Sequence, residues 1–189
     1  MDPTIIRLSE SAGHKIFRGH LDVNIIGMRT ASRVAGAFDD RIHLCYQNEA
    51  GEWVENRWPA TTDPGVYWLE HPMRVEGTAI LAPGQYRGAY QLGKHRGYEA
   101  LVQTGDEVSV YRDNNRDQTL DMETETLTSG HFGINIHRAS SSNESIRVHK
   151  WSAGCQVFAD PEDFRMFLGL VKKSMARYGD RVSYTLLAE

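Results

Sequence analysis

The sequence has little cysteine, no long apolar run and no block of basic residues. Only Cys45 and Cys155 among its 189 residues are cysteines, and their separation matches no metal-binding motif. A single disulfide could join them, but a chain of this length buries enough apolar surface to fold without one. The apolar runs are far shorter than the ~20 residues that a membrane-spanning helix needs. No membrane span is therefore expected.

The N-terminus, Met1 to Leu8, lacks the basic head and apolar stretch of a signal peptide. The chain is accordingly expected to be cytoplasmic as made. Its net charge is −4, with acidic and basic residues interspersed, so no nucleic-acid partner is expected. The length predicts a single domain over residues 1–189 and leaves the oligomeric state open.

Turn residues divide the first two thirds of the chain into short β-rich runs. This spacing predicts a mainly β, β-rich α+β fold, a largely antiparallel sandwich or barrel. The expected strands are Val23–Met28, Arg41–Tyr46, Trp53–Trp58, Val66–Leu69, Ala79–Leu81, Gln85–Leu92, Ala100–Gln103, Val108–Tyr111, Phe132–His137 and Val182–Leu187.

One amphipathic helix is predicted late in the chain, from about Asp160 to Tyr178. Asp160 suits the N-cap, Pro161 suits the first turn, and apolar residues then recur at helical spacing. Gly179 is a plausible stop. A weaker helical pattern runs from Pro3 to Phe17 and is interrupted by Gly13.

The segment Trp151 to Phe158 contains Cys155 directly after a Ser-Ala-Gly run, and His137 lies 18 residues earlier at the end of an apolar stretch. Gly154 permits a sharp turn whose N–H groups, those of Gly154 and Cys155, would stabilise a thiolate and then an oxyanion. Ser152 offers a hydroxyl beside the thiol. The pattern predicts a cysteine nucleophile with His137 as its base.

The alternation Ile134-Asn135-Ile136-His137 places Asn135 and His137 on one face of the predicted strand. Asn135 or a backbone carbonyl would orient His137. The alternative interpretation is a buried structural cysteine beside a solvated histidine, and the residue pattern alone leaves both open.

These residues resemble the signature of the L,D-transpeptidase catalytic domain, the YkuD-like family. The resemblance covers roughly residues 79–158 and rests on Ile136-His137 and on Ser152-x-Gly154-Cys155-x-Val157, with a weaker similarity at Ala82 to Tyr86. The chain departs from the family at Arg138, where glycine is usual, and at Gln156-Val157-Phe158, where an arginine is usual. It looks like a divergent branch found in phages and prophages.

The resemblance implies a YkuD-like β fold and, with no cofactor, acylation of Cys155 by a peptidoglycan stem peptide, with His137 as base. An amine or water would then resolve the thioester, which leaves L,D-transpeptidase and L,D-carboxypeptidase or peptidase activity open. It also implies action at the cell wall or periplasm after release or delivery. The alternative is a non-catalytic phage structural or wall-binding module that retains the fold.

Other polar residues carry weaker predictions. His95, Arg96, Arg138 and Trp151 are candidate substrate contacts: stem peptides are acidic, which favours the basic residues, and Trp151 lies beside the cysteine turn. A solvated loop is the preferred interpretation of His95 itself, as it is of His131 and His149. The Asp113–Asp121 loop has oxygen side chains at alternate positions but lacks the glycine of a calcium loop, and a polar hairpin is preferred. A zinc site at Cys155 is not favoured, and no metal is expected. Cys45 is expected to be a structural thiol.

Overall fold

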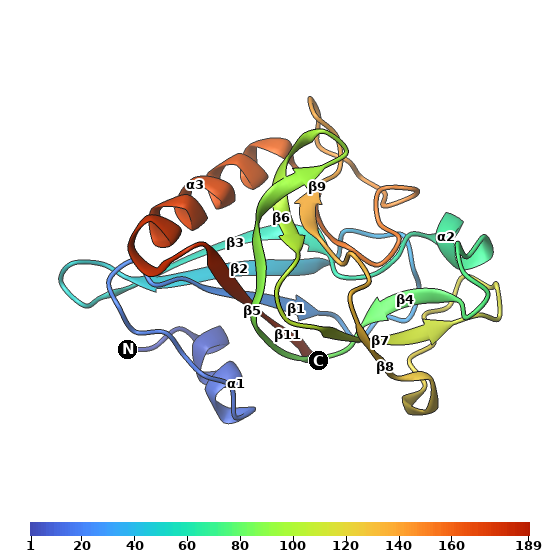
Figure 1. The fold of residues 1–189 in the computed structure, drawn as a ribbon, viewed down its shortest axis with the longest axis horizontal. Helices are drawn as coiled ribbons and strands as arrows, with labels where there is room; N and C mark the ends of the chain where they lie inside the picture. The colour runs from blue at the N-terminus through green and yellow to red at the C-terminus, as the bar shows by residue number, and fades with distance from the viewer.

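The computed structural model describes all residues, 1–189, and its core is an eight-stranded closed barrel (Figure 1). The strands follow the order β1-β11-β5-β6-β9-β10-β3-β2 around the barrel. Their bounds are β1 (Asn24–Arg29), β2 (Asp40–Gln47), β3 (Trp53–Thr61), β5 (Gly84–His95), β6 (Tyr98–Gln103), β9 (Ile136–Arg138), β10 (Gln156–Phe158) and β11 (Arg181–Ala188). The predicted mainly β, α+β class is confirmed, and the barrel is the form it takes.

The barrel is mixed rather than wholly antiparallel. β1 pairs in parallel with β11, and β9 pairs in parallel with β10, while the other neighbours are antiparallel. Closing the sheet leaves few free edges, and alternate side chains fill the interior. The main core contains 25 buried residues, drawn from nearly every strand and from the late helix.

The late helix α3 (Pro161–Tyr178) was predicted correctly. The Asp160 carboxylate accepts the Glu162 N–H at 2.7 Å, which satisfies a free donor of the first turn, and Gly179 follows the last turn with φ 105°. Phe164, Phe167 and Val171 enter the core, where Phe167 lies 4.8 Å from the Phe158 ring of β10. The helix covers one side of the barrel in Figure 1.

A three-stranded sheet lies beside the barrel, in the order β4-β7-β8. Its strands are β4 (Thr78–Leu81), β7 (Val108–Asp113) and β8 (Thr128–Gly130), and the 3-10 turn η1 (Thr124–Thr126) precedes β8. The expected strand Val66–Leu69 was wrong, because these residues form the short helix α2 (Val66–Glu70). The Gly65 carbonyl accepts from Trp68, so Pro64-Gly65 starts a helical turn instead of ending a strand.

Two further predictions were too long. The N-terminal helix α1 covers only Thr4–Ser11, and the chain leaves it at Gly13, where φ is 82°. Of the expected strand Phe132–His137, only the end is regular. Gln103 Oε1 accepts hydrogen bonds from the N–H groups of Phe132 and Ile134, both at 3.1 Å. A side chain thus takes the place of the backbone carbonyls that a neighbouring strand would supply.

Cys45 lies in β2, fully buried in a small cluster with Ile5, Ile6 and Ile26, and neither cysteine forms a disulfide. Burial raises the pKa of its thiol to about 12. The expected structural role of Cys45 fits this position.

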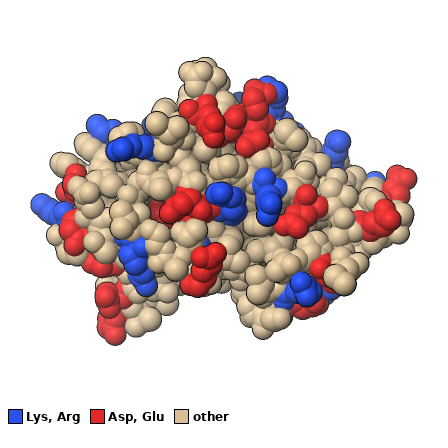
Figure 2. Space-filling model, turned by 180° about the vertical axis from the view of Figure 1, so that it is seen from behind, with Lys and Arg blue, Asp and Glu red and all other residues tan.

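Basic and acidic side chains are interspersed over the face shown in Figure 2. None of the helices is both long and apolar enough for a membrane crossing.

Candidate active site

The parallel pairing of β9 with β10 brings His137 and Cys155 into one region. Val157 pairs with His137, and the Gln156 N–H donates to the Asn135 carbonyl at 2.9 Å. Because side chains alternate along a strand, Cys155 shares a face with Val157 and lies diagonally opposite His137. Residues 18 positions apart in the sequence are therefore brought into one region, His137 on β9 and Cys155 directly before β10.

The turn before the thiol is held by Ser152 and by the shape of Gly154. The fully buried Ser152 hydroxyl accepts the Gly154 N–H at 3.1 Å and donates to the Cys155 carbonyl at 2.8 Å. Gly154 has φ 116°, and an added Cβ would lie 2.4 Å from the Ala79 carbonyl oxygen. Glycine is thus needed for contact with β4, a different reason from the expected access of a substrate carbonyl.

The expectation that two N–H groups of this turn are free for an oxyanion is half right. The Gly154 N–H is already bonded to Ser152, whereas the Cys155 N–H makes no hydrogen bond. Of the two expected donors, only the Cys155 N–H is therefore free, and Gly154 and Ser152 support the turn.

The Cys155 thiol is half-buried and protonated in its resting environment. Sγ donates to the Gly133 carbonyl at 3.5 Å and accepts the Asn135 N–H at 3.4 Å. Burial raises the pKa of this thiol to about 11, against the opposing effects of the Asn135 N–H and the Arg96 charge. In this environment the loss of hydration outweighs the stabilisation that the one N–H bond would give to a thiolate.

His137 is held in the tautomer that suits a base. Its Nδ1 lies 2.8 Å from the Arg138 carbonyl, which can only accept, so Nδ1 carries the proton. The Tyr98 hydroxyl, 3.2 Å from Nδ1, donates to the same carbonyl at 3.0 Å. Nε2 consequently bears a free lone pair, and it is buried without a hydrogen-bond partner. A backbone carbonyl, one of the two expected alternatives, orients the ring.

His95 is not the solvated loop histidine that the sequence favoured. Its ring stacks on His137 with centroids 3.9 Å apart and planes 13° apart. Asn135 Oδ1 accepts the Gln103 N–H, so its Nδ2 donates to His95 Nδ1 at 3.2 Å. This leaves the proton of His95 on Nε2. Asn135 and His137 thus share a face as predicted, and Asn135 acts on His95.

Burial is the largest of the effects that together lower the pKa of His137 to about 3; His95, Arg96 and Arg138 lower it as well, while the hydrogen bond to the Arg138 carbonyl opposes them. The pKa of His95 is itself lowered by burial and by Arg96. The imidazole of His137 is therefore neutral at physiological pH, which a base requires.

A hollow of about 230 Å³ opens beside the two imidazoles, between the β5–β6 hairpin and the loop before Cys155. Its lining brings together all four candidate substrate contacts, His95, Arg96, Arg138 and Trp151. The Arg138 guanidinium lies 4.1 Å from the centroid of the Tyr98 ring, and Trp151 is 38% exposed. Cationic and aromatic groups thus surround the space next to His137.

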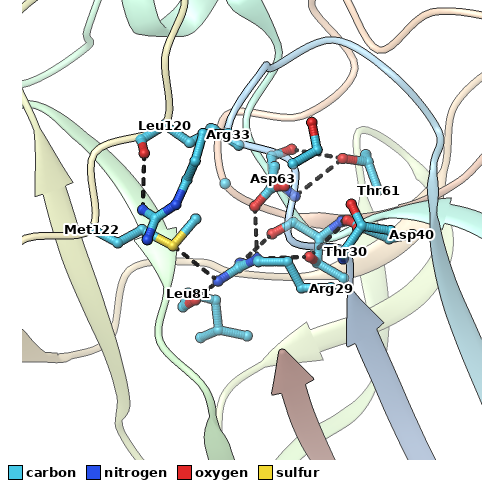
Figure 3. Close-up of polar contacts among 12 residues, drawn as sticks. Arg29, Thr30, Arg33, Asp40, Thr61, Asp63, Leu81, Leu120 and Met122 are labelled. Atoms are coloured by element: carbon cyan, nitrogen blue, oxygen red, sulfur yellow. Dashed lines mark hydrogen bonds and ion pairs between the residues drawn. The ribbon is translucent and has the colours of Figure 1, made fainter. Parts of the chain in front are cut away.

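A buried polar network around Arg29 and Asp63, shown in Figure 3, extends to Gln156 of β10. The Tyr184 hydroxyl donates to Gln156 Oε1 at 2.8 Å, and Gln156 Nε2 reaches the Thr62 carbonyl at 3.4 Å. The same carbonyl accepts from Arg29, which forms an ion pair with Asp63 at 2.9 Å. Gln156, one of the departures from the family pattern, is therefore a core residue and does not face the thiol.

The remaining polar predictions lie outside this site. His131 bonds to the Gly105 carbonyl at 2.8 Å, and His149 is exposed in the loop before the cysteine turn. Within the Asp113–Asp121 loop, Asn115 Nδ2 bonds to Asp117 and Asp121, while Asp113 Oδ1 is buried without a hydrogen-bond partner. Nowhere do three or more His, Cys, Asp or Glu side chains gather in a group suited to a metal ion.

Two residues that help to position His137 and the thiol were not predicted from the sequence. Tyr98 contacts the His137 ring, and Gln103 bonds to residues 130, 132 and 134, which set the position of the thiol's partner Gly133. Both side chains lie in or beside a predicted strand, but their partners are about 30 or more residues away. No local pattern marks such contacts.

Comparisons with protein-family models, with curated proteins and with solved structures find no match for this chain.

Proposed function

We propose that the protein is a cysteine-dependent acyltransferase or peptidase acting on peptidoglycan stem peptides, of the L,D-transpeptidase type. The observation that carries the proposal is the free Nε2 lone pair of His137. It is buried without a hydrogen-bond partner, on the strand that pairs with β10, which Cys155 directly precedes. An unpaired buried acceptor is costly, and a base that takes up a proton during reaction gives it a use. The resemblance of these residues to the YkuD-like signature supplies the substrate class.

The proposed reaction starts from the neutral pair. As Sγ attacks a peptide carbonyl, the thiol proton passes to His137 Nε2, and the free Cys155 N–H donates to the developing oxyanion. The C–N bond then breaks, and His137 returns the proton to the leaving amine. An amine or water attacks the thioester, transfers its proton to His137 and releases Cys155, which is reprotonated.

Contacts to the substrate come from the hollow beside His137. Arg96 and Arg138 line it, and the Nε2–H of His95 makes no hydrogen bond within the protein. These groups suit the carboxylates of a stem peptide. With the phage-type resemblance, we infer that the protein acts at the cell wall after release or delivery.

Acylation by a carbapenem, followed by intact-protein mass spectrometry, tests the nucleophile. The wild type and Cys45→Ala should gain the mass of one acyl group, because Cys45 is fully buried. Cys155→Ala should gain none while keeping its circular-dichroism spectrum. Equal labelling of Cys155→Ala would refute the assignment. Incubation with purified muropeptides then separates transfer from hydrolysis by the products formed.

One observation favours a second candidate, a non-catalytic phage structural or wall-binding module. The resting thiol and imidazole are both neutral, with pKa values of about 11 and about 3, as in a structural pair. This candidate predicts sedimentation with purified peptidoglycan and neither carbapenem adduct nor muropeptide turnover. A carbapenem adduct that is lost in His137→Ala would eliminate it.

A further inference from the structure

A second hollow lies next to the cysteine turn and shares no lining residue with the one beside His137. It has a volume of about 70 Å³ and lies among α2, β4 and β7. Ala153, two residues before the thiol, forms part of its wall, and so does Phe132, whose neighbour Gly133 accepts from Sγ. Both segments that hold the thiol thus contribute to the wall of this hollow, although Cys155 itself does not line it.

Two arginines, Arg74 and Arg112, line this hollow without a carboxylate partner. Neither forms an ion pair, and Glu76, the nearest acidic influence on Arg112, makes none with either. The Arg112 side chain is half-buried, with its guanidinium 4.7 Å from the Phe132 ring centroid and 3.3 Å from the Gly77 carbonyl. Arg74 is exposed, and its side chain makes no hydrogen bond.

Two like charges in a partly apolar hollow repel each other, so an anion placed between them is attracted by both and relieves the repulsion. Trp68, Met73 and Phe132 provide apolar walls. A space of about 70 Å³ accommodates a carboxylate on a short aliphatic stem and excludes a whole peptide. The chemistry therefore matches one terminal or side-chain carboxylate close to the bond under attack.

We propose that Arg74 and Arg112 form a carboxylate-binding subsite that positions the peptide whose carbonyl is attacked by Cys155. The biological use of the subsite rests on the proposed acyl transfer, whereas its affinity for carboxylates is independent of that reaction. The acyl donor is then a peptide with a free carboxylate near the scissile bond, and the hollow beside His137 is left for the second peptide or for water.

Alkylation of Cys155 tests the subsite without requiring acyl transfer. The probes are N-bromoacetyl-alanine and N-bromoacetyl-alaninamide, which differ only in the charged carboxylate. Second-order rates are measured at pH 9 in the Cys45→Ala background, and the ratio of the acid rate to the amide rate is the readout. Arg177→Gln, an exposed position on α3, is the control for losing one surface charge.

Loss of either guanidinium should lower this ratio about three- to tenfold, and Arg177→Gln should leave it within twofold. Arg112→Lys should retain part of the preference, since it keeps the charge without the planar fork. If Arg112→Gln does not fold, Arg74→Gln alone tests the subsite, because the Arg74 side chain makes no hydrogen bond whose loss could destabilise the fold. A ratio in Arg74→Gln equal to that in Arg177→Gln would overturn the subsite. Loss of muropeptide turnover with an intact ratio pattern would instead count against the proposed function.

Discussion

The reactivity of Cys155 should reveal a thiol that is harder to ionise than free cysteine, with no low-pH activation by His137. Folding favours the protonated form, since burial raises the pKa of the thiol to about 11. A free thiol has a pKa of about 8.5, so the thiolate fraction at pH 7.5 is lower by roughly 300-fold in the protein. The higher basicity of the thiolate raises its nucleophilicity, with a Brønsted slope of about 0.45, and recovers roughly 13-fold. The net expectation is alkylation about 20-fold slower than that of a free cysteine.

Iodoacetamide rates measured from pH 6 to pH 10 in Cys45→Ala test this expectation. The logarithm of the rate should rise with a slope close to one throughout, because the thiol titrates above the range. A synthetic peptide of residues 150–158 supplies the free-cysteine reference, whose rate should level off near pH 9. Steric shielding of the half-buried thiol lowers the rate without changing the slope, so the slope decides.

A plateau below pH 8 in the folded protein would refute this reasoning, because it would mean that a thiolate is stabilised at rest. His137→Ala provides a second check. The imidazole is neutral and does not bond to Sγ in the resting site, so the iodoacetamide profile should change little, whereas carbapenem acylation should be lost.

Two further predictions concern stability. Gly154→Ala should lower the free energy of unfolding by about 3 kcal/mol or more, because its Cβ would lie 2.4 Å from the Ala79 carbonyl oxygen at a φ of 116°. Gly169→Ala, where a Cβ on α3 meets no other atom, should raise it by up to about 1 kcal/mol. Urea unfolding of the two variants and the wild type measures both changes. His137 has a lowered pKa of about 3, so the unfolded chain binds its proton first and stability should fall below pH ~6.5 by up to about 1.4 kcal/mol per pH unit. Asp63, with a raised pKa of about 7, acts in the opposite direction between about pH 4 and pH 7, so the difference between wild type and His137→Gln isolates the histidine; equal pH slopes in the two proteins would contradict the assignment.

The sequence predicted the elements whose signals are local. Asp160 and Gly179 mark the ends of α3, and the turn residues separate most strands correctly. It could not predict the helical turn at Val66–Glu70, because a short apolar run has no period long enough to separate helix from strand. The same limit applies to the irregular backbone before β9, which depends on one distant side chain, that of Gln103.

The candidate site divides in the same way. Cys155 and His137 were chosen from residue type and turn chemistry, and the β9–β10 register brings them together. Two features depend on contacts between segments far apart in the sequence, which no local pattern marks. They are the stacking of His95 on His137 and the meeting of Arg74 and Arg112, which have no ion-pair partner, in one hollow. The raised pKa of the thiol could not be predicted from residue type, because a turn shows possible N–H donors but not the burial that opposes them.

The neutral resting pair has a consequence for the kind of chemistry the site can perform. Burial raises the pKa of the thiol to about 11 and lowers that of the imidazole to about 3, and both shifts disfavour a preformed thiolate–imidazolium pair. Proton transfer to Nε2 must therefore accompany the formation of the bond between Sγ and the carbonyl carbon, and reactivity depends on a polarised carbonyl positioned against the Cys155 N–H. A thiol of high pKa is also a poor leaving group, so the thioester should persist long enough to be observed by mass. Persistence allows time for an acceptor to enter the hollow beside His137, which makes the access of amine and water to that hollow the property that separates transfer from hydrolysis.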